Sequence, residues 1–319
     1  MNDRILITGG AGFIGANLAA ALAKRPGVDV VVLDDFSHAG WKNLIPVDCE
    51  VRAGSVADAS LHEEIARGAF SAILHQGAIS DTTVRDERRM LEINTNAFAD
   101  MLAASAAGGA RMVYASSAAT YGNAPAPNRV GGVETPANIY GFSKLAMDRI
   151  ARRWFDRHPG VIVGLRYFNV YGPGETHKGR TASMILQLYQ QIKAGGRPRL
   201  FKYGEQKRDF VYIRDVIAAN LAALEAPRSG VCNVGSGRAR TFNDIIANLE
   251  RLLGRKLDVE YFDNPYDFYQ NHTEADIGPT TELLGWTPAW SLEDGMKEYI
   301  ELLESGFDGP VEAADGAGA

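Results

Sequence analysis

The chain has 319 residues, 46% of them hydrophobic, which is enough for one large α/β domain with a smaller domain appended. A net charge of −6 without a basic run argues against a nucleic-acid-binding protein. The two cysteines have no CxxC spacing and the six histidines no ligand spacing, so we expect neither a disulfide framework nor a metal site. No signal segment and no apolar run of roughly 20 residues is present, so we expect a cytoplasmic protein with no membrane partner.

The first predicted element is a strand that enters a helix through a glycine turn. The apolar run at 5–7 is followed by three glycines at intervals of three residues, and the apolar residues then recur with helical spacing. Glycine permits the turn and the close approach of a pyrophosphate, and the helix N-terminus offers N–H groups to an anion. The expected cofactor contacts here are Gly9, Gly12, Phe13, Ile14 and Gly15.

A second predicted strand, Val28 to Leu33, ends at Asp34, which lies 19 residues after Gly15, where a ribose-binding acid is expected. Asp34 and Asp35 together favour free ribose hydroxyls and would repel a 2′-phosphate, which favours NAD over NADP. Lys42, in the following loop, could instead bind such a phosphate, although a solvated loop lysine explains it equally well. The sequence therefore predicts bound NAD(P).

Strand-like segments continue at 49–53, 72–75 and 112–115, separated by helical patterns at 61–67 and 90–107. This regular alternation predicts a Rossmann-type doubly wound parallel sheet, with a smaller C-terminal α/β substrate-binding domain after it. Small residues follow the predicted fourth and fifth strands and would leave room for a nicotinamide. Asn94 lies in the second helical pattern, where a buried asparagine would bond a backbone group near the cofactor and an exposed one would do nothing.

Tyr140 and Lys144 open a further predicted helix and project from the same face, because they are four residues apart. A phenol is a poor base at neutral pH, and we expect the ammonium of Lys144 to lower its pKa. Ser116 or Ser117, at the preceding strand end, would hydrogen-bond the same substrate hydroxyl. A Tyr and a Lys at this spacing also occur as ordinary surface residues, but three elements that meet at one crevice favour catalysis.

The glycine turn, the serine-rich strand end, Tyr140-xxx-Lys144 and the segment 166–173 (RYFNVYGP) resemble the extended short-chain dehydrogenase/reductase superfamily, specifically its nucleotide-sugar epimerases and dehydratases. The resemblance covers nearly the whole chain. Within that superfamily, segments 75–78, 81–83, 115–122 and 174–179 resemble the ADP-L-glycero-D-manno-heptose 6-epimerases, which supply a lipopolysaccharide core precursor in Gram-negative bacteria. The narrower resemblance implies NADP as cofactor and a homo-oligomer, possibly a pentamer.

The same resemblance implies the remaining site residues. Tyr140 and Lys178 would be the two alternative acid/base groups, with Lys144 and Ser116 assisting. Further cofactor contacts would be Gln76, Gly77, Ala78, Asn94 and Val170. Substrate contacts would be Ser80, Ser116, Asn169, Arg180, Gln187, Phe201, Gly204, Arg208 and Tyr269.

Arg208 would face the diphosphate of the substrate, since a guanidinium matches phosphate oxygens bidentately, and a salt bridge to Asp209 or Asp215 is the alternative. A helix is expected at 180–193 and a strand at 199–202. We expect the NAD(P)-binding domain at 1–170, with segments at about 205–240 returning to it. The substrate-binding domain would occupy mainly 171–307, and 308–319 would be a flexible tail.

The predicted reaction is epimerisation of a nucleotide-linked sugar, ADP-D-glycero-D-manno-heptose to its L-glycero epimer, by transient oxidation at C6. A dehydratase would need an additional Asp-Glu pair at the fifth strand end, where the chain has 117–120 (SAAT). A dinucleotide-sensing protein without catalysis would typically lack the tyrosine or the lysine. Arg180 and Gln187 replace a serine and a histidine of the heptose epimerases, so the sugar and the nucleotide stay open.

Overall fold

The computed structural model describes residues 3–263 and 271–311. Its central sheet has seven strands in the order β10-β6-β5-β4-β1-β2-β3, and all of the pairings are parallel. The predicted doubly wound α/β class is confirmed. The strands are β1 (Asp3–Thr8), β2 (Val28–Asp34), β3 (Glu50–Ala53), β4 (Ala72–His75), β5 (Arg111–Ser117), β6 (Ile162–Tyr167) and β10 (Gly230–Val234).

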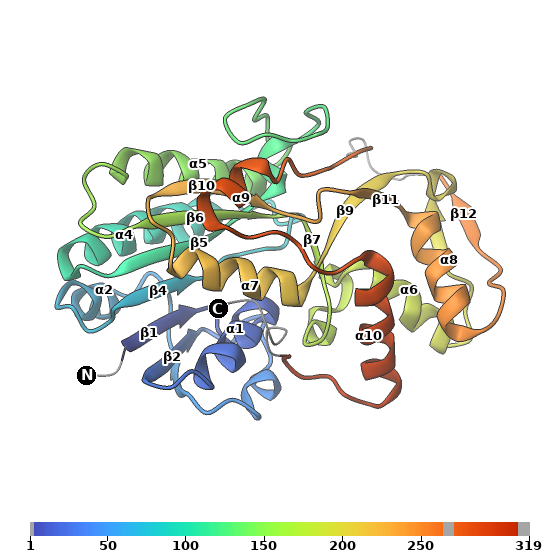
Figure 1. Cartoon of the computed structure of the whole chain (residues 1–319), viewed down its shortest axis with the longest axis horizontal. Helices are drawn as coiled ribbons and strands as arrows, with labels where there is room; N and C mark the ends of the chain where they lie inside the picture. The colour runs from blue at the N-terminus through green and yellow to red at the C-terminus, as the bar shows by residue number, and fades with distance from the viewer. Residues whose placement is uncertain (1–2, 264–270, 312–319) are drawn as a thin grey trace.

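Helices cover both faces of this sheet, which explains why its inner strands are almost continuously apolar (Figure 1). One face carries α2 (Ala59–Ala66), α4 (Ala97–Gly108) and α5 (Ile139–Trp154), and the other carries α1 (Phe13–Ala23) and α7 (Ile213–Leu224). In β1, Leu6 packs into the first of these two cores and Ile7 into the second, as the period of a strand requires.

Two predicted helices differ from the structure. The pattern at 90–107 forms α3 (Glu87–Leu91), a π-helical turn η2 (Glu92–Asn96) and α4. The helix expected at 180–193 is α6 (Met184–Lys193), preceded by the short helix η4 (Thr176–Thr181). Ser183 caps α6 by accepting the N–H of Leu186, and Gly179, with a φ of 53°, interrupts η4. Arg180 therefore lies in η4 and not in α6.

The smaller part of the molecule lies beyond one end of the large sheet (Figure 1). Strands β7 (Asn169–Tyr171), β9 (Lys207–Tyr212) and β11 (Ala239–Thr241) form one small sheet, and β8 (Arg199–Phe201) pairs with β12 (Glu260–Phe262). Helices α6, α8 (Phe242–Leu253) and α10 (Leu292–Glu304) pack here, while α9 (Gly278–Leu284) contacts β10. In the sequence between β9 and β11, α7 and β10 bring the chain back to the large sheet, where β10 pairs with β6.

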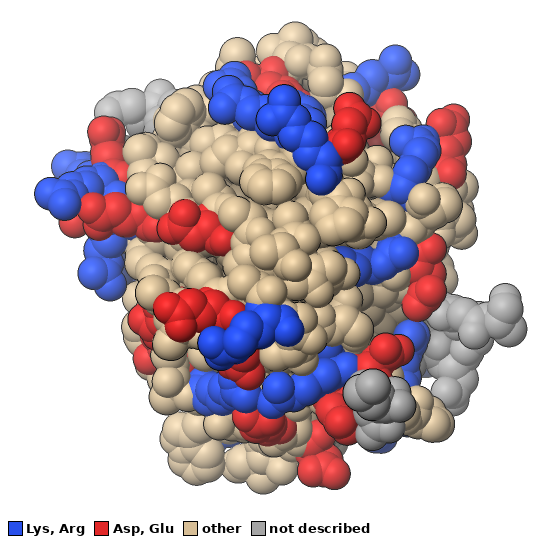
Figure 2. Space-filling view, turned by 90° about the vertical axis from the view of Figure 1, so that its left-hand side faces the viewer, with Lys and Arg blue, Asp and Glu red and all other residues tan. Residues whose placement is uncertain are grey.

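On the face shown in Figure 2, basic side chains are mixed with acidic ones and form no continuous basic stripe. None of the described helices combines the length and the apolar character that crossing a bilayer requires. Within the same residues, no group of three or more histidine, cysteine or acidic side chains is arranged to hold a metal ion.

Candidate active site

Gly9 and Gly15, in the turn after β1, are glycines for reasons internal to the fold. Gly9 has a φ of +64°, and a Cβ there would lie 2.6 Å from the backbone nitrogen of Gly77. A Cβ on Gly15 would overlap the carbonyl oxygen of Gly9. Gly9 and Gly77 follow β1 and β4, which pair side by side at the point where the strand order reverses. In open α/β sheets, ligands bind at that point.

Gly12 is constrained by neither of these effects. Its φ of −74° and ψ of 177° are accessible to any residue, and a Cβ would meet only the carbonyl oxygen of Gly9, at 3.2 Å. It is the N-cap of α1 and provides no side-chain hydrogen bond to the helix N-terminus, which begins at Phe13 and Ile14. A bare helix N-terminus beside a residue without a Cβ fits a pyrophosphate group.

The carboxylate of Asp34, at the end of β2, reaches back to the glycine turn. Its Oδ2 accepts the N–H of Ala11 at 3.0 Å and its Oδ1 accepts the N–H of Phe36 at 2.9 Å. Burial raises the pKa of the Asp34 carboxyl, and these two hydrogen bonds oppose the rise. Asp35 is exposed and accepts both the N–H and the hydroxyl of Ser37. The two acids thus lie at the carboxyl end of β2, and Asp34 is hydrogen-bonded to the glycine turn.

The loop after β2 folds back onto the glycine turn through Asn43, not through Lys42. The Nδ2 of Asn43 donates to the carbonyl of Ala11 at 3.0 Å and lies 3.2 Å from Nδ1 of His177. Lys42 is exposed in the short helix η1 (Trp41–Leu44). Asn43 therefore connects the glycine turn with the loop that carries Lys178, a role that its sequence position does not reveal.

Tyr140 and Lys144 lie one turn apart at the start of α5, where Asn138 caps the helix by accepting the N–H of Gly141. The Nζ of Lys144 is 5.9 Å from the ring centroid of Tyr140 and donates to the carbonyl of Ala115 at 2.8 Å. Burial lowers the pKa of Lys144 to about 8. The two side chains therefore meet at the carboxyl end of β5, as their spacing predicts.

The pKa of Tyr140 in the protein by itself is raised, whereas its spacing from Lys144 predicts a lowered one. Burial raises the pKa of Tyr140, because the phenolate loses its solvation, and a hydrogen bond with the side chain of Ser117 opposes this rise. The Oγ of Ser117 also accepts the N–H of Ala119 at 3.1 Å, which leaves its own proton for the phenol oxygen.

This geometry replaces Ser116 by Ser117 as the partner of Tyr140. Ser116 is 2% exposed, and its Oγ has no hydrogen-bond partner among the described residues. Adjacent side chains of a strand point to opposite faces, so the two serines cannot both turn towards the tyrosine. Of the two serines that the sequence offers, Ser117 therefore lies beside Tyr140, and the contact of Ser116 with the reacting hydroxyl stays a prediction.

Residues after β4 form the opposite wall of the crevice. The Oε1 of Gln76 accepts the hydroxyl of Tyr167 at 3.2 Å, and its Nε2 donates to Asn220 at 3.3 Å. The N–H of Gly77 donates to the hydroxyl of Thr8 at 3.2 Å, and Ala78 is half-buried. Hydrogen bonds from β1, β6 and α7 thus fix this loop.

Asn94 is fully buried in the π-helical turn η2, which excludes the surface alternative. Its Oδ1 accepts the N–H of Ile79 at 2.8 Å, and its Nδ2 donates to the carbonyl of Ile79 at 3.0 Å and to the hydroxyl of Ser143 at 3.1 Å. Asn94 therefore joins the loop after β4 to the helix of Tyr140 and Lys144.

Lys178, in η4, comes to the glycine turn from a different part of the chain. Its Nζ lies 5.4 Å from the centroid of the Phe13 ring. Burial lowers the pKa of Lys178, and the carboxylate of Glu175 opposes this effect. Arg180, two residues further along the chain, is exposed.

Glu175 itself is a residue that the sequence does not single out. It is fully buried at the start of the same loop, and burial raises its pKa. Its oxygens accept the N–H of Gly172 at 3.3 Å, and the N–H and hydroxyl of Ser183 at 2.6 and 2.7 Å. Glu175 therefore fixes both ends of the Lys178 loop.

The residues expected to contact substrate are spread over the small sheets and the loops around them. Ser80, Asn169 and Arg180 are exposed, and Val170, expected at the cofactor, is half-buried. The Nε2 of Gln187 donates to the carbonyl of Ala182 at 2.7 Å, so this side chain supports the Lys178 loop. Tyr269 lies outside the described residues.

Phe201, Gly204 and Arg208 lie together on β8, the short helix η5 (Lys202–Gly204) and β9. Phe201 packs edge to face on Phe262, and Gly204 has a φ of +70°. Arg208 is buried, with its guanidinium carbon 5.9 Å from the ring centroid of Phe242.

The two acids considered as salt-bridge partners of Arg208 have other hydrogen-bond donors. Asp209 accepts the N–H groups of Ser236, Gly237 and Ala275, and burial raises its pKa to about 6. Asp215 accepts the N–H groups of Ala289 and Trp290. Both acids hold loops in place.

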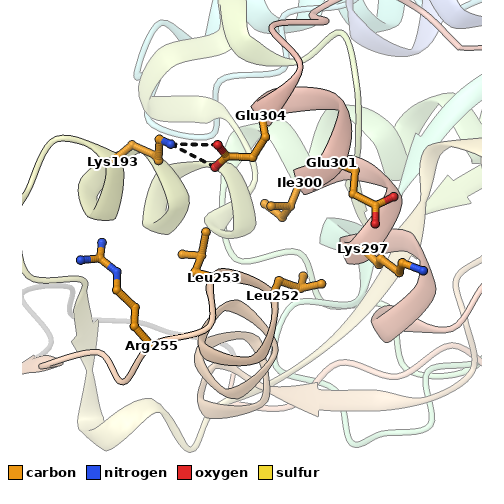
Figure 3. Close-up of a pocket in the computed structure, with 8 residues that line it drawn as sticks. All are labelled: Lys193, Leu252, Leu253, Arg255, Lys297, Ile300, Glu301 and Glu304. Carbon is orange, nitrogen blue, oxygen red and sulfur yellow. Dashed lines mark hydrogen bonds and ion pairs between the residues drawn. The ribbon is translucent and has the colours of Figure 1, made fainter.

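A separate pocket of about 530 Å³ lies between α6, α8 and α10 (Figure 3). An ion pair between Lys193 and Glu304, at 2.9 Å, links two of these helices at its edge. None of the residues predicted for cofactor or substrate lines it. The lining residues are Lys193, Leu252, Leu253, Arg255, Lys297, Ile300, Glu301 and Glu304.

The strand order, the glycine turn and the Tyr140–Lys144 pair at one sheet edge are those of a Rossmann-type dehydrogenase or epimerase fold. Residues 5–235 match the NAD dependent epimerase/dehydratase family. The chain belongs to this family, which confirms the broad resemblance seen in its motifs.

Individual relatives are similar over nearly their whole length. The ADP-L-glycero-D-manno-heptose-6-epimerase of Thiobacillus denitrificans is 36% identical over 332 residues, covering 95% of this chain and 99% of the relative. The crystal structure of the Helicobacter pylori enzyme of that name has a TM-score of 0.90 and 44% identity, over 95% of this chain and 97% of that one. The UDP-glucuronic acid 4-epimerase of Bacillus cereus, in complex with UDP-glucuronic acid and NAD, has a TM-score of 0.84 and 25% identity, over 95% and 100% of the two chains.

Proposed function

We propose that the protein is an isomerase that converts ADP-D-glycero-D-manno-heptose into ADP-L-glycero-D-manno-heptose by transient oxidation at C6. Similarity over nearly the whole chain to two epimerases of this name supports the substrate. The proposal is supported by the positions of Tyr140 on α5 and Lys178 in η4, two side chains that can transfer protons and that come from different segments of the chain. Epimerisation at one carbon requires proton transfer in two orientations of the substrate.

The residues around the glycine turn fit a dinucleotide. Because Gly12 has no Cβ, there is space for a phosphate beside its backbone, at the N-terminus of α1, which has no side-chain cap. Asp34 and Asp35 are placed for free ribose hydroxyls, which favours NAD, the cofactor in the complex of the Bacillus cereus epimerase. When bound, the nicotinamide supplies the acceptor, and then the donor, of a hydride. We assign Gln76, Gly77, Ala78, Asn94 and Val170 to the walls of the same site.

Tyr140 and Lys178 divide the proton transfers between them. As hydride leaves C6, one of them takes the proton of the C6 hydroxyl, and the substrate becomes a ketone. The ketone turns over within the site, and the other group protonates its oxygen as hydride returns to the opposite face. Ser117 directs its proton at the phenol oxygen, and Lys144 provides positive charge that stabilises the phenolate.

Substrate contacts are assigned to the surfaces that face this crevice. Arg208 is our candidate for the diphosphate, and we assign Phe201 on β8 and Gly204 in η5 to the substrate as well. We assign four further residues to contacts with the sugar of the substrate, namely Ser80, Asn169, Arg180 and Gln187. Residues 1–170 with the returning segment at about 205–240 form the cofactor domain, 171–307 form mainly the substrate domain, and the enzyme works in the cytoplasm as a homo-oligomer.

A dehydratase is the nearest alternative in the same family. Elimination of water needs an additional general acid beside the sugar. At the end of β5, residues 118–121 form a short 3₁₀ helix, η3, of sequence AATY, which has no carboxylate. This composition favours epimerisation.

The proposal is tested by cofactor release and by substrate choice. Acid should release NAD from the purified protein, and ADP-D-glycero-D-manno-heptose should be converted to its C6 epimer faster than any UDP-sugar offered at the same concentration. NADP in the acid extract would overturn the cofactor assignment alone. Conversion of a UDP-sugar in preference to the ADP-heptose would overturn the substrate assignment and leave the reaction type standing.

A further inference from the structure

Beneath the Tyr140–Lys144 pair lies a buried ion pair that the mechanism above does not use. Asp148 and Arg166 both have fully buried side chains. The Oδ2 of Asp148 accepts a hydrogen bond from Nε of Arg166 at 2.8 Å and lies 2.7 Å from Nη2 of the same guanidinium. The Oδ1 of Asp148 accepts the hydroxyl of Tyr114 at 2.8 Å. Two buried charges of this kind cost solvation, and apolar residues of similar volume would often be equally stable. A role other than stability is therefore worth seeking.

The position of Asp148 on α5 suggests that role. Tyr140, Lys144 and Asp148 succeed one another at intervals of four residues, so they share one face of the helix, one turn apart. The ammonium of Lys144 donates to a neutral acceptor, the carbonyl of Ala115, at 2.8 Å. The Asp148 carboxylate is the next group along the same face, inside the core.

Arg166 extends this arrangement to the loop that leads into α5. The Nη2 of Arg166 lies 2.8 Å from Oε1 of Glu134, and its guanidinium carbon lies 4.8 Å from the ring centroid of Tyr121. The Tyr121 hydroxyl donates to Asn233 of β10 at 2.5 Å. One buried cation thus connects the catalytic helix, the loop before it and the returning strand of the large sheet.

We propose that Asp148, held in place by Arg166, is a positioning residue for the reaction: its carboxylate keeps the buried ammonium of Lys144 charged beside Tyr140. The proposal deepens the proposed function, because it explains how a lysine that has lost its solvent still supplies the positive charge that the phenolate requires. Burial lowers the pKa of Lys144, and the negative charge of Asp148 is the effect that opposes it.

The other groups around Lys144 do not supply that charge. His75, on β4, is neutral near pH 7 because burial lowers its pKa to about 3, and Tyr114 of β5 is hydrogen-bonded to Asp148 itself. Arg166 of β6 is a cation, so loss of Asp148 would leave a positive charge that disfavours the ammonium further. The charged side chains of α3, η2 and α4 are exposed to solvent, namely Glu87, Arg88, Arg89, Glu92 and Asp100.

The direct test is a titration of Lys144 in the protein without substrate. Lysine labelled with ¹³C at Cε would be followed by NMR from pH 6 to 10, and the Lys144 resonance would be assigned by its loss in Lys144→Met. In the wild type the midpoint should lie near 8. Asp148→Asn should lower it by about 0.5 pH unit or more, since a neutral amide no longer stabilises the ammonium.

Tyr114→Phe is the matched control, because it removes one hydrogen bond to Asp148 and leaves the charge. Its Lys144 midpoint should stay within about 0.2 unit of the wild type, because the charge of Asp148 is unchanged. If Asp148→Asn does not fold, the double variant D148N/R166M removes both charges and should still lower the midpoint. An unchanged Lys144 midpoint in either folded variant would overturn the proposal.

A second readout separates positioning from structure. In Asp148→Asn the rate of epimerisation should fall more at pH 8.5 than at pH 6.5, because Lys144 is then deprotonated at lower pH. An equal loss at every pH would show a structural role and contradict the proposal. Because the NMR titration needs no substrate, failure of the wild type to epimerise ADP-heptose would reject the proposed function without deciding this inference.

Discussion

At the scale of single residues, the turn after β1 contains one glycine that the fold requires and one that we assign to the pyrophosphate. A Cβ on Gly15 would overlap the backbone of Gly9, whereas a Cβ on Gly12 would meet only one carbonyl oxygen, at 3.2 Å. Sequence spacing treats the two positions alike. The structure predicts that substitutions at them fail for different reasons, the first in folding and the second in binding.

Gly12→Val should fold and should lose its affinity for NAD(P), because the branched side chain occupies the space that a pyrophosphate needs at the N-terminus of α1. Calorimetric titration with NAD and thermal unfolding of the same sample would check both statements. Gly15→Ala is the comparison, and it should lower the unfolding temperature. A Gly12→Val protein that binds NAD as the wild type does would show that the phosphates lie elsewhere.

Tyr140→Phe and Lys178→Met should each lower the epimerisation rate by about 10² or more, the scale of a general acid/base group. Lys297→Met is the matched control and should leave the rate unchanged, since Lys297 is an exposed lysine of α10 that lines only the separate pocket. With an aldehyde analogue held in one orientation, hydride transfer should survive one of the two substitutions and fail in the other. Inverting C6 of the analogue should reverse that outcome, and wild-type epimerisation by Lys178→Met would rule out its role.

At the scale of elements, the site depends on how α5 is joined to the loop after β4. Asn94 makes this connection from a π-helical turn, with two hydrogen bonds to Ile79 and one to Ser143. A turn of this kind is uncommon inside a helix and is frequent at functional sites. It places a buried amide between the loop after β4 and α5.

Asn94→Ala should lower the free energy of unfolding by about 1–3 kcal/mol, since the polar groups of Ile79 and Ser143 lose buried partners. NAD affinity should fall as well, because the loop at 76–79 is released. Asn96→Ala, an exposed position in the same turn, is the control. Urea unfolding and NAD titration measure the two effects, and equal values for both variants would contradict this role of Asn94.

Many of the helices and strands, and part of the candidate site, could be predicted from the sequence. The features that the sequence did not predict have physical causes. The apolar runs indicate the parallel sheet, because strands that are buried on both faces are almost continuously apolar, and the glycine spacing indicates the turn. Ser117 and Ser116 are chemically identical, and only the strand geometry assigns the hydrogen bond with Tyr140 to Ser117. Glu175 and Asn43 resemble ordinary loop residues, since their partners are distant in sequence. The pKa of Tyr140 depends on burial, which residue spacing does not report.

At the scale of the whole molecule, the large sheet supplies the cofactor edge and the small sheets lie beyond it (Figure 1). The chain crosses between these two parts more than once, because α7 and β10 return to the large sheet after β8 and β9. Arg208 therefore lies on a small sheet, in β9, whereas Tyr140 lies on α5, which covers the large sheet. Such an arrangement suits a substrate whose nucleotide and sugar are held by separate surfaces.

We expect a homo-oligomer in solution, possibly a pentamer, on the strength of the resemblance to the heptose epimerases. Light scattering on a size-exclusion column at micromolar concentration would measure the mass. A monomer of 34.5 kDa would count against that narrower assignment and would leave the catalytic assignments untouched.

The most direct measurement of the central claim is the fate of deuterium at C6. ADP-D-glycero-D-manno-heptose carrying deuterium on C6 would be incubated with the purified protein in ordinary water, and the product would be analysed by NMR and mass spectrometry. Because the same hydride leaves and returns, the product should be the L-glycero epimer, with the deuterium retained on C6 and the mass unchanged. Loss of the deuterium to solvent, a product lighter by one water, or no conversion at all would contradict this account.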